Sequence, residues 1–306
     1  MLTQRLGNET QTQDEYIDNL INVIKHNPGS VDEVWFATQY GYPPVSFHNK
    51  VADDIIKQAD KFRKACVRVS LQVSNTVGHG EYIGSTDCSG LVYDGSPAEH
   101  LVGPDGTTAA YSFCWRGENF IKYMKDTLAA YAKIKPHTIW FDDDFRPTHH
   151  TPIEYGCFCD KCIEKFNRLH KTDFTREALV KEINFGDIVW RERFIEFIKD
   201  GVGELMRELC KIIHKLLPGT YVGLQQGTMG GYVGDAGNSY LYKIIYEVTG
   251  YPMGVRPGGG AYTDQDMREF IKKGNEIERQ ARECQDFVTD IRPEIESLPY
   301  VSYGKS

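Results

Sequence analysis

Short apolar segments alternate with longer amphipathic segments along almost the whole chain of 306 residues. Seven apolar segments are predicted strands, at residues 31–40, 67–75, 107–115, 137–145, 221–228, 252–257 and 286–297. Apolar residues at helical spacing predict helices around and between them, at residues 14–26, 49–65, 117–133, 188–217, 239–248 and 264–284. Strands that alternate with helices form a mostly parallel sheet, either closed as a barrel or open with helices on both faces.

Polar and aromatic residues follow almost every predicted strand on its C-terminal side. In a (β/α)8 barrel these strand ends converge on one mouth, where the active site lies. The spread of such residues over the strands therefore predicts a single α/β domain, residues 1–306, with the fold of a (β/α)8 TIM-type barrel. The strand-end residues are Gln39, Tyr40, Asn75, His79, Trp115, Arg116, Asp142, Asp143, Asp144, Gln225, Gln226, Arg256, Glu294 and Glu296.

The predicted strands are one short of the eight that close such a barrel. Only residues 298–306 follow the seventh strand, and they are too few for a helix and an eighth strand. The barrel is therefore predicted to be truncated after strand seven. Either the chain is a fragment of a longer polypeptide or a partner chain closes the barrel. A fragment is favoured, because a barrel open along one side leaves exposed strand edges.

The charge and hydropathy of the chain exclude several classes of partner. A formal net charge of −8 and a pI near 5.6 argue against nucleic acid and against anionic membrane surfaces. No stretch approaches the ~18 consecutive apolar residues of a membrane span, and the first residues lack the pattern of a signal peptide. We therefore expect a cytoplasmic protein that acts on a neutral or cationic small molecule and that can form a homo-oligomer.

Three cysteines lie within six residues at Cys157, Cys159 and Cys162, close enough in sequence to bind one metal ion. A tetrahedral zinc site needs a fourth ligand. Cys114, at the end of the predicted third strand, is favoured because strands three and four are neighbours in a barrel; the rivals are His149 and His150. Four thiolates make a closed, structural zinc site with no position for a catalytic water. Free cysteines and an iron–sulfur cluster are the alternatives.

Carboxylates follow two of the predicted strands. Asp142, Asp143 and Asp144 come directly after strand four, and burial plus mutual repulsion would raise the proton affinity of one of them, as a general acid requires. Glu294 and Glu296 stand at alternate positions of strand seven, roughly across the barrel. Glycoside hydrolysis needs such a pair, ~5 Å apart for a covalent intermediate and ~6.5–9.5 Å apart for direct attack by water. The alternatives are a solvated acidic turn or a cation site for the aspartates, and a solvated strand end for the glutamates.

The cysteine spacing and its surroundings resemble a known family. Cys114 precedes the Cys-x-Cys-x-x-Cys motif by 43 residues, a Trp-x-Asp-rich strand end lies between them, and the segment EKFNRLH follows. This region, about Tyr111 to His170, resembles the zinc-bearing region of glycoside hydrolase family 42 β-galactosidases and their uncharacterised relatives. The resemblance implies a (β/α)8 barrel, retaining chemistry, an acid/base after strand four and a nucleophile after strand seven.

Carried over to this sequence, the resemblance makes the four cysteines zinc ligands, Asp144 the acid/base and Glu296 the nucleophile. The chain departs from the family at Asp143-Asp144, where the family has Asn-Glu. An aspartate is shorter than a glutamate by one methylene, so the position of the substrate or the stereochemical outcome is expected to differ. Galactoside specificity is not implied.

Other strand-end residues are candidates for binding a carbohydrate. The tryptophans could stack on a sugar ring or belong to the core, and the remaining side chains could hydrogen-bond hydroxyl groups. No glycine-rich loop matches a phosphate-binding pattern, so no nucleotide cofactor is expected. The candidates are His79, Trp115, Arg116, Trp140, Gln225 and Arg256.

Three functions are consistent with these residues. The first is a glycoside hydrolase that uses a carboxylate pair, with Asp143 and Glu294 as the neighbouring candidates beside Asp144 and Glu296. The second is a carbohydrate-binding barrel that keeps the metal site without catalysis. The third is a metal-dependent hydrolase that uses the aspartates with His149 or His150.

Overall fold

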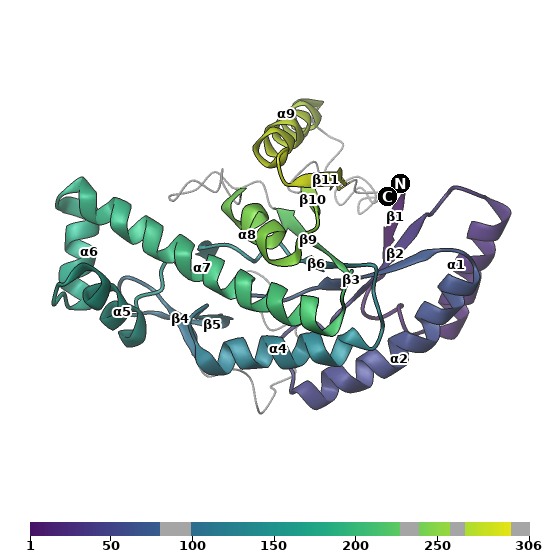
Figure 1. Cartoon of the computed structure of the whole chain (residues 1–306), viewed down its shortest axis with the longest axis horizontal. Helices are drawn as coiled ribbons and strands as arrows, with labels where there is room; N and C mark the ends of the chain where they lie inside the picture. Colours follow the sequence, from purple (N-terminus) through teal and green to yellow (C-terminus); the bar gives the residue numbers. More distant parts are fainter. Residues whose placement is uncertain (80–98, 227–238, 258–266, 295–306) are drawn as a thin grey trace, which may run out of the picture.

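The computed structural model describes residues 1–79, 99–226, 239–257 and 267–294. Its main sheet contains seven strands, all paired in parallel, in the order β1-β2-β3-β6-β9-β10-β11. This confirms an α/β fold that matches a TIM barrel truncated after strand seven (Figure 1). The strands are β1 (Thr3–Arg5), β2 (Glu33–Ala37), β3 (Arg68–Val73), β6 (Thr138–Phe141), β9 (Tyr221–Gln226), β10 (Met253–Pro257) and β11 (Val288–Ile291).

Helices connect the strands and cover the outer face of the sheet, as Figure 1 shows for α2, α4 and α7. The first helix begins at Asp14, as predicted, and the Thr175 hydroxyl caps α6 by accepting from the Ala178 N–H at 3.2 Å. The helices are α1 (Asp14–His26), α2 (Val45–Lys64), α4 (Glu118–Ala132), α5 (Asp160–His170), α6 (Arg176–Phe185), α7 (Ile188–Leu216), α8 (Ser239–Thr249) and α9 (Met267–Cys284).

One predicted strand does not belong to the main sheet. Residues 107–115 form β5 (Thr108–Phe113), which pairs antiparallel with β4 (His100–Val102) in a separate hairpin. The sequence missed β1, which takes the vacant place in the barrel beside β2. Alternation identifies a strand without identifying its partner, and a strand of three residues is too short to show alternation at all.

Alternation along the strands separates the two faces of the sheet. Apolar residues on the outer face, such as Phe36, Leu71 and Phe141, are buried under the helices. On the inner face Trp140 stacks on Trp35 with ring centroids 4.4 Å apart. The inner face of β9 and β10 carries glycines at this level, because a Cβ on Gly223 or Gly254 would lie 2.3 or 2.4 Å from the Trp140 ring.

A buried arginine links the two edge strands through the barrel interior. Arg292, directly after β11, donates from Nη1 to Glu33 Oε1 at 2.8 Å and to Thr3 Oγ1 at 3.3 Å. Its guanidinium also lies 5.1 Å from the centre of the Trp140 ring. Side-chain contacts therefore connect β11 to β1 and β2, although β1 and β11 pair directly with β2 and β10 alone in the described part of the chain.

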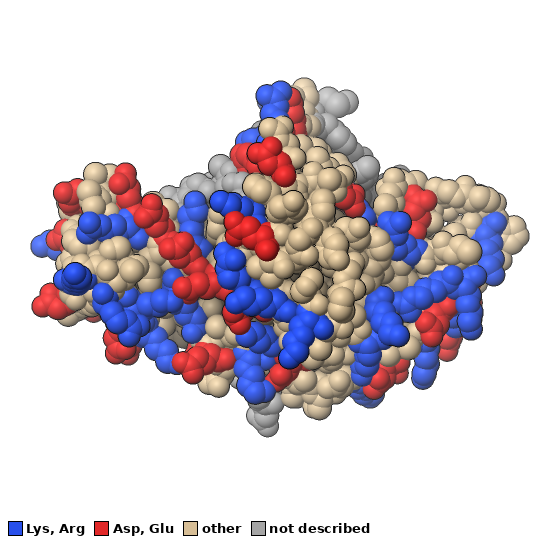
Figure 2. Space-filling view, in the orientation of Figure 1, with Lys and Arg blue, Asp and Glu red and all other residues tan. Residues whose placement is uncertain are grey.

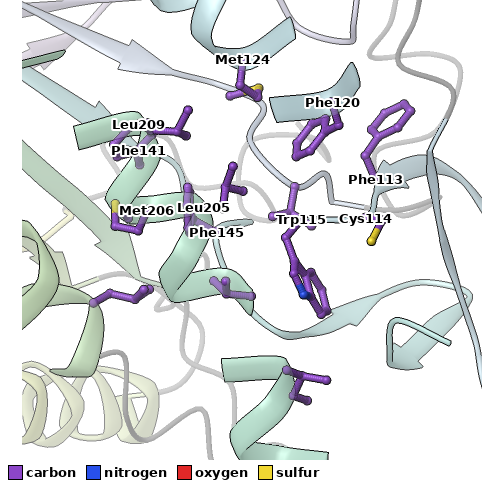
Figure 3. Close-up of a cluster of buried hydrophobic side chains, with 14 of the residues drawn as sticks. Phe113, Cys114, Trp115, Phe120, Met124, Phe141, Phe145, Leu205, Met206 and Leu209 are labelled. Carbon is purple, nitrogen blue, oxygen red and sulfur yellow. The ribbon is translucent and has the colours of Figure 1, made fainter. Parts of the chain in front are cut away.

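The largest hydrophobic cluster lies between the sheet, α4 and α7. Figure 3 shows aromatic and aliphatic side chains from these elements packed together, with Cys114 at the edge of the cluster beside Phe113 and Trp115. Two hairpins extend from this core: β4–β5, and β7 (Thr148–His150) with β8 (Ile153–Tyr155). Of the predicted metal ligands, Cys114 directly follows the first hairpin, Cys157 and Cys159 follow the second, and Cys162 lies in α5.

The outer surface of the helices carries acidic and basic side chains side by side (Figure 2). Examples are Lys165 with Glu204 at 2.8 Å and Lys61 with Asp14 at 2.6 Å. None of the helices in the described residues combines the length and apolar character needed to cross a bilayer.

Candidate functional site

Four cysteines meet in one cluster, and we call Cys114, Cys157, Cys159 and Cys162 the cysteine cluster. Their sulfur atoms all lie within 4.8 Å of one another, with Cys114 Sγ 3.6 Å from Cys162 Sγ and 3.9 Å from Cys159 Sγ. A tetrahedron of thiolates with Zn–S bonds of about 2.3 Å has sulfur atoms roughly 3.8 Å apart. The cluster can therefore hold one metal ion in a closed site.

The surroundings of Cys157 also suit a metal-bound thiolate. Its sulfur accepts hydrogen bonds from the backbone N–H groups of Val102 and Cys159, each at 3.4 Å. Burial, followed by the neighbouring thiols, raises the pKa of Cys157 well above its usual range. A bound cation would remove this cost of ionisation, because it compensates the charge that burial disfavours.

Cys114 reaches the cluster by a different route from the one expected. It follows β5, and β5 is not a neighbour of β6 in the main sheet. The β4–β5 hairpin instead carries Cys114 to the other three cysteines, as the Cys157 bond to Val102 of β4 indicates. The rival ligands bind elsewhere: His149 contacts Glu154 at 3.2 Å, and His150 Nε2 contacts the Arg146 carbonyl oxygen at 2.9 Å.

A second group of titratable side chains lies at the C-terminal end of the main sheet. We call His79, Asp142, Asp143, Arg256 and Glu294 the mouth group. They come from the ends of β6, β10 and β11 and from the loop after β3. Their positions follow from the parallel sheet, because the C-terminal ends of its strands share one edge.

Asp143 and His79 form an ion pair, with His79 Nε2 3.1 Å from Asp143 Oδ1. Burial alone would lower the pKa of His79, but the hydrogen bond to Asp143 and the charges of Asp144 and Asp142 raise it to about 9. Burial would raise the pKa of Asp143, but the bond to His79 and the charges of His79 and Arg256 hold it well below its usual range. Near neutral pH the pair is therefore an imidazolium beside a carboxylate.

Arg256 joins the carboxylates of β6 and β11. Its Nη1 donates to Glu294 Oε2 at 2.6 Å, while its Nη2 lies 4.0 Å from Asp143 Oδ2. Gln225 Oε1 accepts from Nε of the same guanidinium at 3.0 Å and holds its orientation. The guanidinium of Arg256 thus lies between the carboxylates of Asp143 and Glu294.

Asp142 lies deeper in the barrel than Asp143. It accepts from Gln72 Nε2 at 3.0 Å and from the Asp143 backbone N–H at 2.8 Å. Burial, followed by the charge of Asp143, raises the pKa of Asp142 to about 6. Asp142 is therefore the aspartate whose proton affinity is raised, as the sequence predicted for one of the three.

Asp144 holds the loop that carries His79. Its side chain is fully buried, and Oδ2 accepts from the backbone N–H groups of Thr76 and Gly78, both at 2.7 Å. The Thr76 hydroxyl donates to Oδ1. On the other side of the loop, the Ser112 hydroxyl donates to the Gly78 carbonyl oxygen at 3.1 Å. The contacts of Asp144 are those of a loop anchor, whereas the more exposed Asp143 faces the other carboxylate.

Three residues predicted to bind substrate have other partners in the structure. Trp115 and Trp140 are both fully buried, which matches the core role that the sequence left open for them. Arg116 contacts α7, where it donates to the Phe197 carbonyl oxygen at 2.7 Å and lies 3.3 Å from Glu204. Glu296, the predicted nucleophile, lies outside the described residues.

Sequence reasoning missed two arginines near the mouth group. Arg5 belongs to β1, which was not predicted, and its Nη2 donates to the Tyr40 hydroxyl. Arg146 lies 3.7 Å from Asp143 Oδ1 and donates to the carbonyl oxygens of Asp143 and Thr148. The signal for Arg146 was its place just after the aspartates, whereas the triplet of β1 offered none.

A cavity of about 670 Å³ lies at the opposite end of the sheet. Its lining includes Lys25, Cys66 and Arg68, and it contains none of the predicted site residues. In TIM barrels this N-terminal end serves stability, and active sites lie at the C-terminal end. The cavity is therefore separate from the candidate site.

Comparison with known proteins bears on the fold. No protein-family model and no curated protein sequence matches the chain. Among solved structures, a β-galactosidase from Rahnella sp. R3 superposes with a TM-score of 0.52 at 13% sequence identity. The alignment covers 87% of this chain and 40% of that enzyme. The shared feature is the fold.

Two further β-galactosidases give the same result. The enzyme from Bacillus circulans sp. alkalophilus has a TM-score of 0.52 and 14% identity, covering 89% of this chain and 41% of the enzyme. The enzyme from the psychrophilic Marinomonas ef1 has a TM-score of 0.53 and 10% identity, covering 86% and 42%. The chain spans about two fifths of the length of these proteins. It therefore shares the barrel fold of these proteins, and its activity and family have to be argued from its own residues.

Proposed function

We propose that the chain is a glycoside hydrolase whose carboxylate pair is Asp143, after β6, and Glu294, after β11. The observation that supports this most directly is Arg256, whose single guanidinium contacts both carboxylates. Glycoside hydrolysis requires two carboxyl groups on either side of the scissile bond. The role that the resemblance gave to Asp144 passes to Asp143, because Asp144 is fully buried and its oxygens accept from the loop after β3.

The acid in this proposal is the pair formed by Asp143 and His79. An acid that donates to a leaving group must be protonated at working pH and must reach the substrate. His79 carries the proton, because Asp143 helps to raise its pKa to about 9, and His79 returns a proton to Asp143 across their 3.1 Å contact as Asp143 protonates the leaving group. Both side chains are partly exposed, at 14% for His79 and 23% for Asp143.

Glu294 is the second carboxylate, and it acts as the nucleophile. Its ion pair with Arg256, at 2.6 Å, fixes the direction of its carboxylate. The resemblance to family 42 implies retention of the anomeric configuration, so Glu294 would form a glycosyl-enzyme intermediate and Asp143 with His79 would activate water in the second step. The sequence assigned this role first to Glu296, two residues further on.

The proposal is tested by turnover of a panel of aryl glycosides. We expect the wild-type chain to hydrolyse at least one of them, and Asp143→Asn and Glu294→Gln to lose that activity while circular dichroism stays unchanged. Binding of sugar without turnover in all three proteins would instead support a non-catalytic carbohydrate-binding barrel.

We further propose that the ion of the cysteine cluster is zinc in a structural role. Four thiolates in a buried cluster suit zinc, and they leave no coordination position for substrate. Elemental analysis of the purified protein is expected to give one zinc per chain. Iron in place of zinc would contradict this assignment.

A metal-dependent hydrolase has one observation in its favour. His79, Asp142 and Asp143 each offer a ligand atom, and these atoms lie within 4.8 Å of one another. Arg146 and Arg256, at 3.7 and 4.0 Å from Asp143, already compensate that charge and disfavour a cation. A chelator that abolishes turnover while the fold and the zinc content stay intact would favour the metal-dependent hydrolase over the carboxylate mechanism.

A further inference from the structure

Arg5 points into the barrel from β1. In the sheet it pairs in register with Trp35, whose ring is stacked on Trp140 inside the barrel. Two residues earlier on the same strand, Thr3 contacts the interior residue Arg292. Side chains at alternate positions of a strand share a face, so Arg5 and Thr3 point the same way. Because the strands run towards the mouth group, Arg5 is the inward residue of β1 nearest to it.

Arg5 is the last residue of β1 and contacts Tyr40, which follows the end of β2, so it lies at the same end of the barrel as the mouth group. Burial opposes its charge, but Tyr40 and the charges of Asp142 and Glu294 raise the pKa of its guanidinium above the ordinary value. Arg5 is nevertheless exposed to solvent and donates to the Tyr40 hydroxyl. Among the residues that the structure describes, no carboxylate lies within 4.0 Å of it. Arg5 is thus a solvent-accessible cation without an ion-pair partner there.

The other cations near the mouth have partners of their own. His79 pairs with Asp143 at 3.1 Å, and Arg256 pairs with Glu294 at 2.6 Å. Arg146 donates to three backbone carbonyl oxygens, including those of Asp143 and His149. These contacts orient the proposed catalytic residues, so none of the three cations is available to a ligand in the way that Arg5 is.

We propose that Arg5 binds an anionic group on the sugar that occupies the mouth, so that the substrate is a glycoside bearing a carboxylate or a phosphate. This inference rests on the proposed glycosidase function and names its substrate class. A guanidinium presents parallel N–H donors that match the two oxygens of a carboxylate or phosphate group.

The local arrangement outweighs the net charge of the chain. The net charge of −8 by itself predicts a neutral or cationic ligand. Exposed charges further apart than about 8 Å are largely screened at physiological salt, so the nearest charges dominate recognition. At the mouth the carboxylates already accept from His79, Arg256 and Gln72, which leaves Arg5 to select the ligand.

The test compares three aryl glycosides that share one leaving group and one sugar stereochemistry: the neutral hexoside, its uronate and its 6-phosphate. We expect kcat/KM for one of the anionic substrates to exceed that for the neutral one by at least about tenfold. Preference for the uronate or for the 6-phosphate identifies which anion Arg5 recognises. Equal rates on all three, or preference for the neutral hexoside, would overturn the inference.

Variants separate Arg5 from a general effect on the fold. In Arg5→Gln the ratio of kcat/KM for the preferred anionic substrate to that for the neutral one should fall by ~10-fold to 100-fold, mainly through KM. Arg5→Lys should recover part of this ratio, because it keeps the charge and loses the paired donors. Arg207→Gln, on α7, where Arg207 pairs with Glu247 of α8, should leave the ratio unchanged. An unchanged ratio in Arg5→Gln would contradict the proposal.

Binding distinguishes failure of this inference from failure of the proposed function. If no glycoside is hydrolysed, the glycosidase assignment fails, and calorimetry with the free uronic acid and the free sugar 6-phosphate still tests Arg5. Wild type should then bind one of them, and Arg5→Gln should weaken that binding at least about tenfold relative to Arg207→Gln. Equal binding in the two variants, or no binding to wild type, would overturn the role of Arg5.

Discussion

The cysteine cluster and the mouth group both bring titratable side chains together, but the cluster contains groups of one kind and the mouth group contains acids beside bases. Three of the four cysteines are fully buried, and their sulfur atoms face one another with no opposite charge among them. The mouth group combines acids and bases in nearly equal number, and His79, Asp143 and Glu294 remain partly exposed. A closed set of like ligands suits an ion that holds loops together, whereas an open set of paired charges suits proton transfer to a substrate.

The loop after β3 connects the two regions. Phe113, next to Cys114, donates from its backbone N–H to the Val77 carbonyl oxygen at 2.8 Å, and Ser112 donates to Gly78. Asp144 holds the same loop from the other side. The position of His79 therefore depends on the segment that the cysteine cluster anchors, although no cysteine belongs to the mouth group.

The largest expected effect comes from opening the cysteine cluster. Cys114→Ser removes one of four thiolates, and metal binding in small zinc domains contributes about 10–16 kcal/mol. We expect the zinc content to fall well below one per chain and the Tm to drop by more than about 10 °C. Cys66→Ser, which changes an exposed thiol, should alter neither quantity. An unchanged Tm in Cys114→Ser would show that the cluster does not stabilise the loops.

The next effect belongs to the mouth group and should leave stability almost unchanged. Glu294→Gln removes the proposed nucleophile, so kcat/KM should fall by at least ~10³-fold, with Tm within a few degrees of wild type. Glu278→Gln on α9 provides the control, since its carboxylate pairs with Arg282 at the surface. Retention of more than about a tenth of the activity in Glu294→Gln would remove Glu294 from the mechanism.

Substitution of Asp144 tests whether this residue holds the loop after β3 or takes part in catalysis. Asp144→Asn replaces the charged acceptor of the Thr76 and Gly78 N–H groups with a neutral amide, so we expect a loss of about 2–3 kcal/mol in the free energy of unfolding. Asp143→Asn should lower the stability less, and the activity more, than Asp144→Asn does. Denaturant titration of both variants measures the first difference, with Asp160→Asn as an exposed control. Equal stability of Asp144→Asn and Asp160→Asn would contradict the anchor role.

The pH dependence gives the smallest effect. The pKa of His79 is raised from 6.5 to about 9, so its ion pair stabilises the fold fully below pH 6.5 and is lost as the pH rises through about 9. The proposed acid is lost over the same range, and kcat/KM should fall about tenfold between pH 8 and pH 10. In Asp143→Asn the pKa of His79, followed by NMR of its ring protons, should move towards 6.5, because the hydrogen bond to the Asp143 carboxylate that raises it is lost. A pKa of His79 that stays near 9 in Asp143→Asn would exclude the pair as the acid.

The sequence predicted the arrangement of strands and helices well because apolar periodicity is local. Helix α1 and strand β6 lie where their apolar residues indicated. Partners in space are not local, and the exchange of β5 for β1 in the sheet is the result. The grouping of Cys114 with the three later cysteines was still predicted, since metal ligation requires a fourth donor whichever strand carries it.

The roles within the three aspartates were beyond the sequence. Asp142, Asp143 and Asp144 have the same side chain, and their difference arises from the groups that they meet: Gln72, His79 and the backbone of the loop after β3. Those contacts depend on the path of a loop that folds back over the strand ends. Arg5 was not predicted as a site residue, because its strand is only three residues long.

The account depends most on Glu294 as the group that attacks the sugar. A 2-deoxy-2-fluoro glycoside of the sugar that the panel identifies, carrying a good leaving group, should accumulate as a glycosyl-enzyme. Peptide mapping by mass spectrometry then locates the label. We predict one label per chain, on Glu294; a label on Glu296, or on an aspartate after β6, would contradict the pairing of Asp143 with Glu294 across Arg256.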